Sequence, residues 1–269
     1  MDRSSETEQP STGGTAERLQ HLLRPDVTWT PTVDGYLDAL PGRAVPPPGR
    51  AQAAWQSTLG AAMYQRMQRV TAAVMAPGFS TVAAQLRLRP GQTVVDVGCG
   101  PGNVTTALAD AVGPHGLAVG VDLSAPMLAR AAHRARPNMG LLRGNATDLP
   151  LRDHCADAAC ATLVIMLVPE PVDALAQMIR IVKPGGWLLV MVPCRPDGLS
   201  AAITGPLMDR VGRFGGARMF TPDEPADLLE QLGCERIRTR QQCNLLTVRA
   251  RTPAATPDST STSSGRNST

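Results

Sequence analysis

From Pro90 onward, the chain alternates short apolar runs with stretches of helical periodicity. The apolar runs predict seven strands, at 93–97, 117–121, 141–142, 156–165, 187–192, 236–239 and 245–249. Helical patterns lie between them, at 103–112, 125–135, 172–182 and 222–232. Such alternation predicts a parallel sheet with helices on both faces. We therefore expect an α/β fold with a doubly wound, mostly parallel, seven-stranded sheet at residues 91–251.

The segment before the first strand has a different pattern. Residues 18–50 are rich in proline, which favours loops and extended structure with at most a short helix. Residues 51–76 place apolar side chains at helical spacing, and Pro77-Gly78 ends that pattern. We expect residues 18–90 to form an N-terminal helical extension. Together with the insertion at 194–221, its helix is expected to cover the ligand-binding edge of the sheet as a lid.

Both ends of the chain are polar and low in complexity. Residues 1–17 are rich in Ser, Thr, Gly and Glu, and residues 252–269 read TPAATPDSTSTSSGRNST. These compositions bury too little apolar surface to offset the entropy of ordering. We expect a disordered N-terminus and a disordered tail.

Charge and cysteine content exclude several function classes. The 26 basic and 23 acidic residues give a formal charge of +3, and the basic residues are scattered along the sequence. We therefore expect no nucleic-acid partner, and no apolar run is long enough for a membrane span. The six cysteines include no CxxC pair, which favours reduced thiols and no metal site. The sequence begins without the apolar centre of a signal peptide, and these features together predict a cytoplasmic protein.

A glycine-rich turn follows the first predicted strand. The sequence Asp96-Val97-Gly98-Cys99-Gly100-Pro101-Gly102 leads directly into the helical pattern at 103–112. Glycines allow a tight turn and let a ligand approach the backbone, and a helix N-terminus offers free N–H groups. The second strand ends at Asp122, whose carboxylate can accept both hydroxyls of a ribose. This arrangement predicts a site for an adenosine-containing cofactor.

Two cofactor classes fit such a site. The dinucleotide fingerprint G-x-G-x-x-G requires glycine or alanine at the position of Asn103. The spacing G-x-G-x-G found here is instead similar to that of class I methyltransferases, so S-adenosylmethionine is the favoured cofactor.

Further blocks extend this resemblance over more than half of the chain. VVDVGCGPG at 94–102, VDLSAPML at 121–128, GNATDLPL at 144–151 and RIVKPGGWLLVMV at 180–192 occur in the order of that family. The chain thus resembles class I S-adenosylmethionine-dependent methyltransferases. It is most similar to the small-molecule branch that contains the ubiquinone and menaquinone biosynthesis methyltransferases.

The resemblance implies a set of cofactor-binding residues. The loop backbone would meet the amino acid part of the cofactor, Asp122 its ribose, and the other side chains its adenine or its sulfonium end. The implied residues are Asp96, Gly98, Cys99, Gly100, Gly102, Asp122, Leu123, Met127, Asn145, Ala146 and Thr162. Asp96 is expected to orient the glycine loop through its backbone N–H groups, and Cys99 to contribute backbone rather than thiol chemistry.

Candidates for the acceptor pocket and for catalysis are fewer. Most of the eight aromatic residues lie outside the predicted sheet, and Tyr64, Phe214 and Phe220 are the candidates to contact a partly apolar small-molecule acceptor. Where many relatives have a histidine pair, this chain has Met166-Leu167. We name no catalytic base, because positioning and desolvation can suffice for displacement at a sulfonium centre when the acceptor is acidic.

Three functions remain open. The favoured one is methyl transfer to a small, partly apolar metabolite by in-line displacement at O, C or N. The alternatives are a nucleotide-dependent oxidoreductase and a non-catalytic S-adenosylmethionine-binding module. Arsenic methylation is a minor option, because the cysteines lie mostly within predicted strands.

Overall fold

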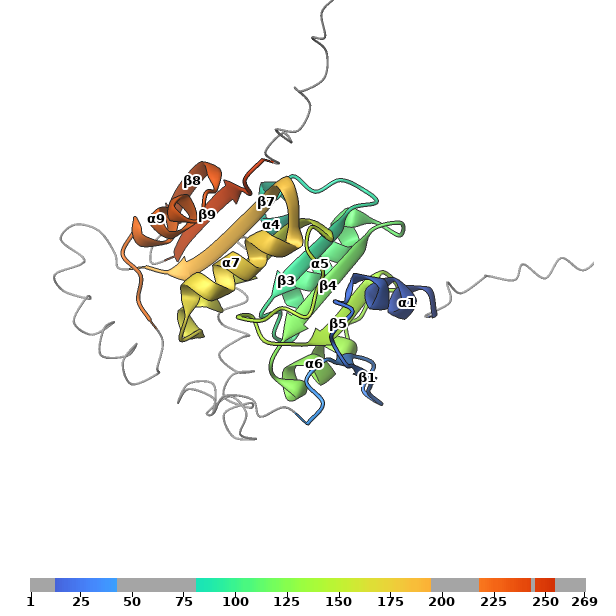
Figure 1. Cartoon of the computed structure of the whole chain (residues 1–269). Coiled ribbons are helices and arrows are strands. Elements are labelled where there is room, and N and C mark those ends of the chain that lie inside the picture. Colours follow the sequence, from blue (N-terminus) through green and yellow to red (C-terminus); the bar gives the residue numbers. More distant parts are fainter. Residues whose placement is uncertain (1–12, 43–80, 195–217, 243–244, 255–269) are drawn as a thin grey trace, which may run out of the picture.

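A single mixed sheet organises the molecule (Figure 1). The computed structural model describes residues 13–42, 81–194, 218–242 and 245–254. The strands in this part are β1 (Thr30–Pro31), β2 (Leu37–Asp38), β3 (Thr93–Val97), β4 (Leu117–Asp122), β5 (Met139–Arg143), β6 (Ala156–Thr162), β7 (Val182–Pro193), β8 (Glu235–Gln242) and β9 (Leu245–Arg251). The helices are α1 (Gly13–Leu22), α4 (Val82–Gln85), α5 (Asn103–Val112), α6 (Ala125–Ala132), the 3₁₀ helix η1 (Ile165–Leu167), α7 (Pro171–Ile181) and α9 (Glu224–Gln231).

The strand order is β1-β2-β5-β4-β3-β6-β7-β9-β8. Strands β5, β4, β3, β6 and β7 are parallel, whereas β9 and β8 add antiparallel strands beside β7. This confirms the predicted α/β class with its mostly parallel sheet. The seven predicted strands are all present, and β1 and β2 of the N-terminal segment extend the sheet beyond β5.

Helices cover both faces of the sheet, which is why its central strands consist mostly of buried apolar residues. On one face α1, α7 and α9 pack through their own side chains, which include Leu19, Met178 and Leu229. On the other face α4, α5 and α6 pack through residues such as Leu86 and Leu108. Strands buried on both faces appear in the sequence as continuous apolar runs, as β3 and β4 do.

The ends of the domain differ from the sequence-based expectation. Helix α1 begins at Gly13, inside the stretch 1–17 that we expected to be disordered. The helix is held by Leu19, which is 2% exposed and packs in the core on the same face of the sheet as α7. At the other end, Thr252 is also 2% exposed, and its N–H donates to the carbonyl of Gly186. The chain therefore stays docked into the start of the segment expected to be a free tail.

Two strand boundaries also differ from the predicted ones. Strand β6 ends at Thr162 rather than at residue 165, because Leu163 adopts a positive φ of 58° that breaks the strand. Strand β7 begins at Val182, directly after α7, rather than at Trp187. The predicted helix at 51–76 lies outside the described residues, as does most of the insertion at 194–221.

Candidate functional site

The candidate site lies where three parallel strands end side by side. Val97, the last residue of β3, pairs with Val121 of β4 and with Ala161 of β6. The residues that follow these strands therefore emerge at one edge of the sheet. In open α/β sheets, ligands bind at this carboxyl edge.

The glycine loop is fixed to the end of β4. The N–H groups of Gly98 and Cys99 both donate to the carbonyl of Val121, at 2.7 and 3.1 Å. The loop glycines have φ of 71° at Gly98, 52° at Gly100 and 81° at Gly102. Side chains other than glycine rarely adopt this left-handed region, so the loop conformation depends on its glycines.

Asp122 joins this loop to the start of α6. Its Oδ2 accepts a hydrogen bond from the N–H of Gly100, and its Oδ1 accepts one from the N–H of Ser124, both at 2.8 Å. Burial raises the pKa of Asp122, while these backbone N–H groups lower it. Two carboxylate oxygens offer about four acceptor positions, so Asp122 keeps acceptor capacity for a ligand after making these bonds.

The carboxyl group of Asp96 anchors helix α5, which differs from the role expected for it. Its Oδ2 accepts a hydrogen bond from Oγ1 of Thr105 at 2.6 Å, and its Oδ1 accepts one from the thiol of Cys160 at 3.5 Å. We expected it to hold the N–H groups of the glycine loop. The side chain is fully buried, and this burial raises its pKa to about 6. Thr105 and Cys160 escaped notice because neither forms a recognisable motif with Asp96.

The side chain of Cys99 in the glycine loop points into the core. Cys99 is buried beside Gly120, where an added Cβ would lie 2.9 Å from its Sγ. Burial and the nearby carboxylates of Asp122 and Asp96 raise the pKa of the Cys99 thiol well above its ordinary value. The thiol therefore stays protonated, and the loop presents backbone rather than a reactive sulfur.

The expected adenine-side residues lie next to Asp122. The N–H of Gly144 donates to the carbonyl of Asp122, which places Asn145 and Ala146 at the same edge. Oδ1 of Asn145 accepts a hydrogen bond from the N–H of Thr147, so its side-chain nitrogen is the end left for a ligand in the described part of the chain. On the other side of Asp122 follow Leu123, half-buried, and Met127, buried at the start of α6.

The acceptor candidates are not brought together in the described residues. Thr162, which is expected to contact the cofactor, ends β6 one residue beyond the level of Val97 and is half-buried at the site edge. Phe220 is fully buried in the core on the α7 face, with the guanidinium of Arg218 5.2 Å from its ring centroid. Its position differs from the expected contact with an acceptor, because a core position leaves no face of the ring for a ligand. Tyr64 and Phe214 lie outside the described residues.

The described residues show no histidine or metal cluster at this edge. All four histidines are exposed, and His154 places its Nδ1 3.1 Å from the carbonyl of Val182. Within the same residues, no group of three or more His, Cys, Asp or Glu side chains is arranged to hold a metal. No described helix has the length and apolar character needed to cross a membrane.

The donor and acceptor set at this edge fits an adenosine-containing cofactor. Asp122 offers carboxylate acceptors suited to ribose hydroxyls, and the amide nitrogen of Asn145 offers a donor suited to an acceptor nitrogen of adenine. The Asp122 carboxylate is held in place before any ligand arrives, because two backbone N–H groups fix its orientation. The residues present therefore fit S-adenosylmethionine.

Comparison with known sequences agrees with this geometry. Residues 95–190 match the family model of the methyltransferase domain. A demethylmenaquinone methyltransferase of Bacillus cytotoxicus is 36% identical over 113 residues, covering 40% of this chain and 48% of that protein. An uncharacterized 37.1 kDa protein in transposon TN4556 of Streptomyces fradiae is 37% identical over 146 residues, covering 51% and 42%. The chain thus spans less than half the length of each of these relatives.

Solved structures share the fold. A methyltransferase from Thermotoga maritima, described as S-adenosylmethionine-dependent and as a possible histamine N-methyltransferase, superposes with a TM-score of 0.58 at 22% identity, covering 74% of this chain and 99% of that one. A methyltransferase from Haloferax volcanii, in complex with the activator Trm112, gives 0.60 at 17% identity, covering 78% and 100%. The [4+2]-cyclase SpnF gives 0.55 at 21% identity, covering 65% and 80%. At these identities the likeness concerns the fold alone, which a cyclase shares.

The fold and the carboxyl-edge site define a Rossmann-like cofactor-binding domain. More particularly, residues 95–190 match the methyltransferase-domain family, and the chain is similar to the demethylmenaquinone methyltransferases, as expected for the class I S-adenosylmethionine-dependent methyltransferases. The family resemblance expected from the sequence is confirmed, and S-adenosylmethionine is the cofactor of this class.

Proposed function

We propose that the protein transfers the methyl group of S-adenosylmethionine to a small, partly apolar metabolite. The observation that carries this proposal is the Asp122 carboxylate, fixed by the N–H groups of Gly100 and Ser124 beside the glycine loop. Such preorganisation serves a cofactor that must present its reactive end reproducibly. When bound, S-adenosylmethionine supplies an electrophilic methyl group on a positively charged sulfur.

The residues of this chain would position and enclose the reactants. Asp122 would hold the ribose, and the backbone of the glycine loop would approach the amino acid part. When the methyl group is transferred, the positively charged sulfur leaves as a neutral thioether, so the protein need not supply an acid. An acidic acceptor hydroxyl needs little help from a base. A hydroquinone or phenol is therefore the acceptor class we favour, and the similarity to demethylmenaquinone methyltransferases supports it.

Two measurements test the proposal. Isothermal titration should show saturable binding of S-adenosylmethionine and of its demethylated product, with no binding of NADH under the same conditions. Transfer of a radiolabelled methyl group should then depend on an added hydroquinone or phenol. Binding of NADH in place of S-adenosylmethionine would establish the oxidoreductase alternative, and binding without transfer to any acceptor would establish the non-catalytic one.

A further inference from the structure

Five arginines gather around one tryptophan at the end of the sheet opposite the glycine loop. Trp187 lies in β7 at the level where β6 and β3 begin. Three guanidinium carbons lie close to its ring centroid, those of Arg251 at 4.5 Å, Arg249 at 4.6 Å and Arg87 at 5.2 Å. Arg236 and Arg238 of β8 line the adjoining cavity. We call these five residues the arginine cluster: Arg87, Arg236, Arg238, Arg249 and Arg251.

The cluster comes from segments that are distant in sequence. Arg87 follows α4 directly, and its backbone takes the left-handed φ of 52°. Arg249 stands opposite Arg238 in the β8–β9 pairing, and Arg251 stands opposite Trp187 in the β7–β9 pairing. The tertiary fold thus concentrates basic residues that are scattered in the sequence.

Within the described residues, none of these five arginines forms an ion pair. Nearby Asp157 is already engaged by Nζ of Lys183 at 2.6 Å and by the N–H of Thr93 at 2.8 Å. Glu235 pairs with Arg251 in the strand register but makes no ion pair with it in the described part. The pKa of Arg249 is lowered, first by burial and then by the charges of Arg87 and Arg238. The positive charges therefore repel one another.

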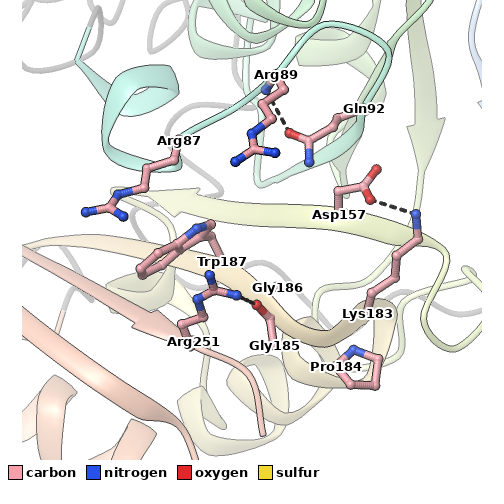
Figure 2. Close-up of a pocket in the computed structure, with 10 residues that line it drawn as sticks. All are labelled: Arg87, Arg89, Gln92, Asp157, Lys183, Pro184, Gly185, Gly186, Trp187 and Arg251. Carbon is pink, nitrogen blue, oxygen red and sulfur yellow. Dashed lines mark hydrogen bonds and ion pairs between the residues drawn. The ribbon is translucent and has the colours of Figure 1, made fainter. Parts of the chain in front are cut away.

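Two cavities lie between these side chains. One cavity of about 340 Å³ runs from Arg87 and Trp187 to Lys183, with Arg89 and Gln92 on its wall (Figure 2). A second cavity, of about 450 Å³, lies between Trp187 and the arginines of β8. Both share Arg87 and Trp187, and their volumes are in the range of small-ligand pockets.

Arg251 has a buried donor atom without a partner in the described part of the chain, which independently indicates that a ligand binds here. One of its guanidinium nitrogens donates to the carbonyl of Gly185, as Figure 2 shows. Its Nε is buried and has no hydrogen-bond partner among the described residues. Buried donors are normally satisfied, and each exception calls for an explanation such as an absent ion.

We propose that the arginine cluster binds the phosphate groups of a small ligand, such as a nucleoside diphosphate or triphosphate. Guanidinium groups form paired hydrogen bonds with phosphate oxygens, and a phosphate carries up to two negative charges. A ligand with two or more phosphates would neutralise several arginines at once, which a single carboxylate could not. This site is independent of the proposed methyl transfer, since it lies at the opposite ends of β3 and β6 from the glycine loop.

The test is titration of the full chain with pyrophosphate, in the presence of saturating S-adenosylmethionine, with sulfate as a comparison anion. We expect saturable binding of pyrophosphate that is at least about tenfold tighter than binding of sulfate. The double variant Arg87→Gln/Arg238→Gln should weaken this binding by about tenfold or more. Both side chains are exposed, so the variant should fold.

The matched control is Arg18→Gln/Arg136→Gln, which removes the same charge far from Trp187. Arg18 donates to the carbonyl of His115, and Arg136 pairs with Asp110 at the surface. This control should bind pyrophosphate as the unmodified chain does. Equal binding of sulfate and pyrophosphate, or an equal loss in both double variants, would overturn the proposal. Tighter binding of single-stranded DNA than of pyrophosphate, lost in Arg87→Gln/Arg238→Gln, would overturn it in favour of a nucleic-acid surface.

Discussion

The carboxylate of Asp122 accepts a hydrogen bond from the backbone N–H of Gly100, 22 residues earlier, at 2.8 Å. This bond ties the end of β4 to the middle of the glycine loop. The same side chain is expected to hold the ribose, so one carboxylate would both shape the loop and contact the cofactor.

Replacing Asp122 with Asn should weaken binding of S-adenosylmethionine by about ten- to a hundredfold. The amide keeps one acceptor oxygen but loses the charge that strengthens hydrogen bonds to backbone N–H groups and to hydroxyls. Isothermal titration measures the change. The control Asp110→Asn removes an exposed carboxylate that pairs with Arg136, and its affinity should be unchanged. An unaltered dissociation constant for Asp122→Asn would remove Asp122 from the cofactor site.

Gly98→Ala should lower the free energy of unfolding by about 2 kcal/mol or more. An added Cβ would lie 2.3 Å from Cγ2 of Val164, and φ is 71°. The Cβ of Val164 also lies 2.5 Å from the added Cβ, so in a double-mutant cycle it is Val164→Gly that should relieve the contact and leave only the backbone strain, about 1 kcal/mol. Gly91→Ala is the control for strain alone, because φ there is 85° and no atom lies within 4 Å. Additive effects of Gly98→Ala and Val164→Gly would show that the two residues do not touch.

Asp96 should make the chain less stable as the pH rises from about 4 to about 6. Burial raises its folded pKa to about 6 from 3.8, so in this window the folded state holds a proton that the unfolded state has released. The contribution of Asp96 to the free energy of unfolding is fully present below pH 4 and is lost above pH 6. The total change is about 3 kcal/mol. Asp96→Asn, which can still bond Thr105 and Cys160, should flatten this dependence.

Urea unfolding of both proteins at several pH values between 4 and 7 provides the measurement. The difference between them isolates Asp96 from the other carboxyl groups, including Asp122. If the free energy of unfolding changes with pH equally in the variant and in the unmodified chain, Asp96 does not titrate in this range.

Thr252→Val should lower the free energy of unfolding by about 1–3 kcal/mol. Its Oγ1 donates to the carbonyl of Lys183 at 2.8 Å and accepts from the N–H of Gly186 at 3.0 Å. Valine has the same shape but leaves these two part-buried groups unpaired. Thr239→Val on exposed β8 should change stability by no more than about 0.5 kcal/mol. Equal effects of Thr252→Val and Thr239→Val on thermal unfolding would mean that the segment after β9 is not docked.

The sequence by itself determined the local elements and the loop between them. Strand β3 and helix α5 begin and end where the patterns predicted, at Thr93–Val97 and Asn103–Val112. Their signals are local, since an apolar run, three spaced glycines and a helical repeat all lie within 20 residues. The resemblance of the successive blocks also indicated Asp122 and Asn145, which the fold brings to one edge through parallel pairing of β4 and β5.

The tertiary structure decided which distant side chains meet. Asp96 contacts Cys160, 64 residues away, because β3 and β6 pair with Asp96 opposite Cys160. Phe220 enters the core beside Cys194, with which it forms a parallel bridge. The arginine cluster forms around Trp187 through the pairings among β7, β8 and β9 and through Arg87, which follows α4. Residues separated by long stretches of chain share no local pattern. Their contacts depend on strand order and register, which the burial of both sheet faces sets only in the folded molecule.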